Sequence, residues 1–218
     1  MYRKGTNAMA DNYSVMLDSM RQRFLASDMD RIAHAFSLET EEGYIRLRFL
    51  GEELRIVRST AEVQLRSGGM WIPAGFDDAM SVYDILTYSP GPPVPSGDYV
   101  NLKSLGELSG ASFSHSPGGF FSRQSEQLTG KAEELRSIFR SRGWPSEEGR
   151  SDAGCFVPVF SGIKVLLRFW DADEDFPAQL QFLWDRSVLQ MMHYETVWFA
   201  SSAVVRRIMS DLKEIKKA

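Results

Sequence analysis

The chain is short of cysteine and of surplus positive charge. Among its 218 residues only Cys155 is a cysteine, and it lies in an apolar run. A lone cysteine excludes an intrachain disulfide and a multi-cysteine metal or iron–sulfur site, so we expect a buried, inert thiol. The basic and acidic residues number 25 and 29, whereas proteins that bind nucleic acid usually carry a basic excess or stripe. We therefore expect no nucleic-acid partner.

Long apolar runs are also missing. No stretch approaches the roughly 18 to 20 apolar residues of a membrane span, and no apolar core of signal-peptide length follows the first residues. We expect a soluble, cytoplasmic protein with no membrane partner. With 43% hydrophobic residues, the chain can bury a real core. We expect one domain over residues 1–218, with a helical segment at 1–40 and a sub-division near 143–153. Composition indicates neither a cofactor nor an oligomeric state.

In the first half, the spacing of apolar residues predicts helices and a meander of strands. The predicted helices cover residues 11–26, 29–36 and 76–89, and the strands lie near 45–49, 54–56 and 63–65. Arginines alternate with the apolar residues of the first two strands, which predicts that one face of the sheet is exposed to solvent. These arginines suit either an anion site or a charge-paired surface, and we favour the second because glutamates are close in the sequence. The residues concerned are Arg46, Arg48, Arg55, Glu52, Glu53 and Glu62.

The second half predicts a sheet covered by a helix. We expect strands at 99–105, 156–160, 163–170 and 179–184, a helical region at 120–142 weakened at Gly130, and a final helix at 194–217. The strands at 163–170 and 179–184 are joined by a short link, so they should be antiparallel. The fold class is therefore α+β: antiparallel sheets packed against helices, with the long C-terminal helix covering the C-terminal sheet.

An acidic segment links those two strands. Asp171, Asp173, Glu174 and Asp175 precede Phe176-Pro177, and we expect the latter pair to fold back onto the core. Clustered carboxylates suit a hard cation such as Ca²⁺ or Mg²⁺, so Asp171, Asp173 and Asp175 are candidate metal ligands. The glycine and terminal glutamate of an EF-hand loop are absent, and an acidic, solvated turn that blocks edge pairing is the interpretation we favour.

A second set of candidate ligand-binding residues is spread over two regions. Asp185 ends a strand, while His193 and Glu195 lie at the start of the last helix; these types suit a metal site or an acid–base pair. We favour structural roles for all three: His193 packs against its neighbours, Glu195 occupies a favourable helix-dipole position, and Asp185 caps a turn through Ser187. His115 lies in a Gly/Ser-rich loop that suits an anion, without the ending of a P-loop.

Several motifs resemble one family. Phe169-Trp170-Asp171-x-Asp173-Glu174-x-Phe176-Pro177, Leu183-Trp184-Asp185-Arg186-Ser187 and Tyr194-Glu195 are joined upstream by Asp84-Ile85-Leu86-x-Tyr88 and Gly97-Asp98-Tyr99-Val100-x-Leu102. Together they resemble the DUF3786 family of prokaryotic proteins, most strongly after residue 156. The resemblance implies a link with anaerobic bacteria and archaea but no assigned biochemistry. The resemblance also implies that some relatives carry a cysteine-rich iron–sulfur domain, and this chain departs from that pattern because Cys155 alone cannot hold a cluster.

Two classes of function fit these observations. The first is a non-catalytic accessory module that binds a small molecule or a partner protein, because no convergent catalytic set is present. The alternative is an enzyme that uses a divalent metal at a shallow acidic site built from Asp171, Asp173, Asp185 and His193.

Overall fold

The computed structural model describes residues 5–110, 121–149 and 151–215 of the chain. These residues form two compact units. The first contains the described residues up to Pro92 together with Gln190–Ala200, and the second contains Pro93–Leu189 together with the residues from Ser201 onward. Each unit has one antiparallel sheet and its own helices. The predicted α+β class is confirmed. The predicted single domain with a sub-division near 143–153 stays a prediction.

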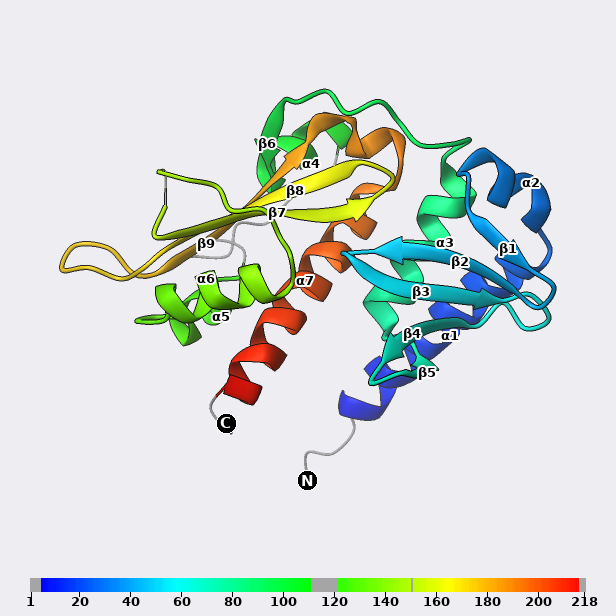
Figure 1. Cartoon of the computed structure of the whole chain (residues 1–218), viewed down its shortest axis with the longest axis horizontal. Helices are drawn as coiled ribbons and strands as arrows, with labels where there is room; N and C mark the ends of the chain where they lie inside the picture. The colour runs from blue at the N-terminus through cyan, green and yellow to red at the C-terminus, as the bar shows by residue number, and fades with distance from the viewer. Residues whose placement is uncertain (1–4, 111–120, 150, 216–218) are drawn as a thin grey trace. The chain divides into compact units, whose positions relative to one another are not determined.

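The first unit combines helices with a five-stranded meander in the order β1-β2-β3-β4-β5 (Figure 1). Its elements are α1 (Gly5–Leu25), α2 (Met29–Ala35), β1 (Glu39–Glu41), β2 (Tyr44–Phe49), β3 (Glu52–Val57), β4 (Val63–Ser67), β5 (Met70–Pro73), α3 (Phe76–Tyr88) and the first residues of α7 (Tyr194–Ile215). The two edge strands, β1 and β5, were not predicted. Every residue of β1 is exposed and polar or charged, so it carries no alternating apolar signal.

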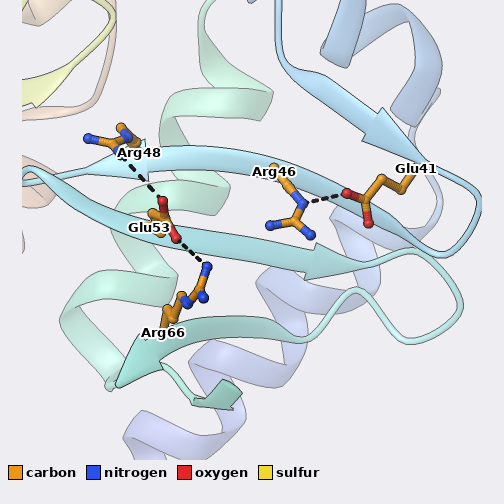
Figure 2. Close-up of polar contacts among 5 residues, drawn as sticks. All are labelled: Glu41, Arg46, Arg48, Glu53 and Arg66. Carbon is orange, nitrogen blue, oxygen red and sulfur yellow. Dashed lines mark hydrogen bonds and ion pairs between the residues drawn. The ribbon is translucent and has the colours of Figure 1, made fainter. Parts of the chain in front are cut away.

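Alternation along the strands gives the first sheet one apolar face and one charged face. Ile45, Leu47 and Phe49 of β2 are buried with Leu54 and Ile56 of β3. Helices α1 and α3 pack against each other, and in Figure 2 they lie behind the sheet while the charged side chains are in front. The predicted meander with one solvent-exposed, charged face is confirmed.

A buried tyrosine stabilises the first unit. The hydroxyl of Tyr83, in α3, donates a 2.6 Å hydrogen bond to the carbonyl of Ala61, and its ring lies 5.7 Å from that of Phe24 in α1. Burial is the main reason why the pKa of Tyr83 rises to about 12. Asp28 caps α2 by accepting a hydrogen bond from the N–H of Arg31.

The second unit contains a four-stranded antiparallel sheet in the order β6-β9-β8-β7. Its elements are β6 (Tyr99–Asn101), α4 (Leu102–Ser109), α5 (Ser122–Gln127), α6 (Ala132–Ser141), β7 (Ala153–Phe160), β8 (Ile163–Trp170), β9 (Gln179–Asp185), the 3₁₀ turn Arg186–Gln190 and the rest of α7. The fully buried indole of Trp184 donates a 3.2 Å hydrogen bond to Ser201 of α7. As predicted, the long C-terminal helix packs on this sheet.

Two local predictions were partly wrong. The strand expected at 99–105 ends at Asn101, because the Asn101 side chain accepts a hydrogen bond from the N–H of Ser104 and starts helix α4. The helical region expected at 120–142 is divided into α5 and α6. Gly130 adopts a φ of 73° between them, a conformation that only glycine tolerates readily. Among the described residues, no helix is long and apolar enough to cross a membrane.

Candidate functional site

Asp185 is buried at the end of β9 and binds five donors. One carboxylate oxygen accepts from the N–H (3.0 Å) and hydroxyl (2.8 Å) of Ser96 and from the N–H (2.9 Å) and hydroxyl (2.6 Å) of Ser187. The other oxygen accepts from the N–H of Gly97 at 2.8 Å. The predicted turn cap through Ser187 is therefore present, and the same carboxylate also holds the end of the proline-rich segment 90–97.

These hydrogen bonds determine the charge state of Asp185. Burial alone would raise its pKa, but the hydrogen bonds from Ser187 and Ser96 outweigh burial and lower the pKa from an ordinary 3.8 to about 2. Since the residue is only 1% exposed and its oxygens are already occupied, Asp185 holds the local fold together. It offers little to an incoming ligand.

His193 is held by Asp84, which is not among the site residues predicted from the sequence. Its ring Nδ1 lies 2.6 Å from one oxygen of Asp84, and its backbone N–H donates a 2.8 Å hydrogen bond to the other oxygen. The Asp84 side chain is 9% exposed, whereas that of His193 is 55% exposed. A carboxylate only accepts, so Nδ1 of the neutral imidazole carries the proton and Nε2 presents a lone pair. No described residue bonds to Nε2.

Tyr88 connects this pair to a cleft. Its ring centroid lies 4.0 Å from that of His193 at an interplanar angle of 47°, and it follows Asp84 by four residues in α3, so both residues share a helix face. Tyr88 also lines a cleft of about 330 Å³ between α2 and the end of α3, within the usual size range of small-molecule sites. The lining residues are Ser27, Asp28, Arg31, Ile32, Ala35, Phe36, Leu86, Thr87, Tyr88, Ser89 and Pro90.

The remaining candidates of the second set take no part in these contacts. Glu195 is exposed in the first turn of α7, where its charge favours the helix dipole. Asp185 belongs to the second unit, while His193 and Glu195 belong to the first. His115 lies outside the described residues.

The acidic segment forms a hydrogen-bonded turn. Asp173 accepts from the N–H groups of Asp175 (2.9 Å) and Phe176 (2.7 Å), an Asx turn of the kind that aspartate favours. Asp171 accepts from Gly130 and Ala172, each at 2.8 Å, while the side chain of Asp175 is exposed. Phe176 is 70% exposed, so the expectation that it folds back onto the core was wrong. Among the described residues, no three His, Cys, Asp or Glu side chains are grouped to hold a metal ion.

The family relationship follows from a comparison with protein-family models. The model of a domain of unknown function, DUF3786, matches residues 28–207. The chain belongs to the DUF3786 family. No curated protein and no solved structure matches the chain. The DUF3786 match includes Asp84, Tyr88 and His193 but assigns no activity to them, so the function must be argued from their geometry.

Two of these residues stood in a motif on which the resemblance was based. The Asp84-Ile85-Leu86-x-Tyr88 segment resembles DUF3786, but its sequence alone does not indicate a binding site. Its two polar residues are the ones that contact His193. An acid and a tyrosine four residues apart in one predicted helix were the signal in the sequence, but nothing in it indicated a histidine 109 residues after Asp84 as their partner.

Proposed function

We propose that this DUF3786 protein is a cytoplasmic, non-catalytic accessory module that binds a small ligand at His193 and Tyr88. The ligand lies against the Tyr88 ring and donates a hydrogen bond to Nε2 of His193. The observation that carries the proposal is the fixed orientation of an imidazole whose side chain is largely exposed. Proteins use buried carboxylates in this way to set the tautomer and direction of an imidazole that meets another group.

Helix capping alone is a weaker explanation for Asp84. The hydrogen bond from the backbone N–H of His193 would be available with any residue except proline at position 193, because it does not involve the side chain. The second hydrogen bond, to ring Nδ1, orders an otherwise mobile side chain at a cost in conformational entropy. The ring contact with Tyr88 adds a flat, partly exposed aromatic surface next to the free Nε2. A planar ligand with an O–H or N–H donor suits both features.

Two simple probes test this proposal. Phenol has a planar ring and one donor, whereas anisole has the ring without the donor. Binding is followed by NMR shifts of the His193 and Tyr88 side chains at pH 8, where free imidazole is neutral. One net hydrogen bond contributes about 0.5–1.5 kcal/mol, so phenol should bind roughly 2- to 12-fold more tightly than anisole.

Two variants distinguish binding at His193 from nonspecific binding elsewhere on the protein. His193→Phe should remove the preference for phenol, while His34→Phe, a change at an exposed histidine of α2, should keep it. Equal shifts by both probes, or a preference for phenol that persists in His193→Phe, would contradict the proposal. Release of a chemically altered ligand would contradict the non-catalytic assignment alone.

A further inference from the structure

The charged face of the first sheet carries four arginines, and three of them are paired with glutamates. Arg46 lies 2.6 Å from Glu41, and Glu53 lies between Arg48 (3.3 Å) and Arg66 (3.0 Å), as Figure 2 shows. The hydrogen bond and charge of Glu41 raise the pKa of Arg46. For these three arginines the predicted charge-paired surface is confirmed.

Arg55, the fourth arginine, has a different environment. Its Nε donates a 2.7 Å hydrogen bond to the side chain of Gln64, and no carboxylate of the described residues pairs with it. Its guanidinium lies 4.0 Å from the ring centre of Tyr44 and 4.5 Å from that of Trp71. Tyr44 belongs to β2 and Trp71 to β5, on either side of β3 in the sheet order, and both rings lie close to the Arg55 guanidinium. The flat guanidinium is therefore held in place while its two terminal NH₂ groups have no acceptor among the described residues.

The register also places another positive charge beside Arg55. Arg46 is its direct partner across β2 and β3, and like charges that face each other across strands are unfavourable. Trp71 relieves part of this cost, because Arg46 and Arg66 lie 5.7 and 5.9 Å from its ring in addition to Arg55. A carboxylate bound at Arg55 would relieve more, since a guanidinium with an unoccupied edge matches two carboxylate oxygens.

We propose that Arg55, clamped by Tyr44 and Trp71, binds a single carboxylate side chain of a partner protein. Arg, Tyr and Trp are the residue types that dominate the binding energy of protein interfaces. Next to them lies a hollow of about 310 Å³ lined in part by Leu38, Leu47 and Leu54, which can receive apolar neighbours of the acidic residue.

The surrounding charges favour a carboxylate over a phosphate chain. The strands and turns of this sheet, residues 39–73, carry five arginines and six glutamates. With these nearly balanced charges, the sheet has no net positive field. Nucleic acids depend on such a field, whereas one carboxylate needs only the local clamp.

A matched pair of peptides tests the inference. Acetyl-leucyl-glutamyl-leucine amide is compared with its glutamine counterpart by following the indole N–H resonance of Trp71. A charge-assisted hydrogen bond contributes more than a neutral one, so the glutamate peptide should bind about tenfold more tightly. Arg55→Lys keeps the charge but removes the planar fork, and it should abolish this difference. Arg48→Lys, on the same face but already paired with Glu53, should change it no more than about twofold.

Several outcomes would overturn the inference. Equal binding of both peptides by the unaltered protein refutes it without any variant, so a misfolded Arg55→Lys protein would not hide a failure. An unchanged preference in folded Arg55→Lys refutes the role of Arg55. Stronger binding of free acetate than of the glutamate peptide would assign the clamp to small carboxylates, and tighter binding of oligouridylate would assign it to nucleic acid. None of these results depends on the phenol site at His193.

Discussion

Replacing Asp185 by asparagine should destabilise the second unit in a manner that depends on pH. The amide has nearly the shape of the protonated acid, and it keeps one oxygen for the donors of Ser96 and Ser187. Its NH₂ group, however, would face the N–H of Gly97, which now donates to the second carboxylate oxygen at 2.8 Å. A hydrogen bond to a charged group contributes about 1.5–3 kcal/mol. Asp185→Asn loses the one from Gly97 and is therefore expected to lower the free energy of unfolding by about 1.5–3 kcal/mol at pH 7.

The shifted pKa gives an independent value for the same effect. A fall from 3.8 to about 2 corresponds to about 2 kcal/mol, at 1.36 kcal/mol for each pKa unit. Because the pKa is lowered in the folded state, this stability is fully present above pH 3.8 and is lost as the pH falls towards 2. The difference between the unaltered protein and Asp185→Asn should shrink by about 2 kcal/mol between pH 5 and pH 2.

Urea unfolding at a series of pH values measures this difference, and amide exchange of Gly97 and Ser187 reports the local opening. Asp175→Asn is the control, because the Asp175 side chain is exposed and should have little effect at any pH. A cost for Asp185→Asn below about 0.5 kcal/mol at pH 7, or a difference that stays constant down to pH 2, would refute the assignment of Asp185 as a charged structural anchor.

Three further changes have defined expected outcomes. Gly154→Ala places a methyl group 2.9 Å from Glu147 and Ser151 and should cost about 1–3 kcal/mol in urea unfolding, whereas Gly43→Ala, with no atom within 4 Å, should be close to neutral. Tyr83→Phe leaves the Ala61 carbonyl without its hydrogen bond and should cost about 1–3 kcal/mol, measured in the same way. In the acidic turn, millimolar Ca²⁺ or Mg²⁺ should leave the melting temperature unchanged, and a cation-dependent rise that disappears in Asp173→Asn would support the metal site instead.

The regular parts of the fold were readable from the sequence because burial repeats along each element. Alternation marked Ile45, Leu47 and Phe49 as one face of a strand, and helical spacing located α3 and α7. The short edge strands escaped because their residues are largely exposed. The end of β6 escaped because the side chain of Asn101 caps a helix there, which is a local hydrogen bond and not a periodic pattern.

The candidate site was less predictable because its partners are distant in the chain. The sequence identified His193 as a residue of interest, but it did not identify Asp84 as its partner. It predicted the link from Asp185 to Ser187, two residues away, but not the links to Ser96 and Gly97, which are 89 and 88 residues away. Pairs of this kind are set by how the elements pack, so neither propensity nor spacing reveals them.

Glu147, in the segment between α6 and β7, shows the same limit. It forms a two-pronged ion pair with Arg168 of β8, and its N–H donates to the carbonyl of Gly154. Both carboxylate and guanidinium are largely shielded from solvent. The close fit of this pair around Gly154 is what leaves no room for a methyl group at that position.

The single thiol of Cys155 allows opening of the second unit to be followed without an introduced label. It lies fully buried in β7, and burial raises its pKa. A thiol reagent therefore reacts only when the strand opens, and the rate of modification reports how often that happens. Because the chain has one cysteine, the signal has a single origin. A cysteine introduced on the surface would react long before it, so a dye can be attached at a chosen position without removing the native residue.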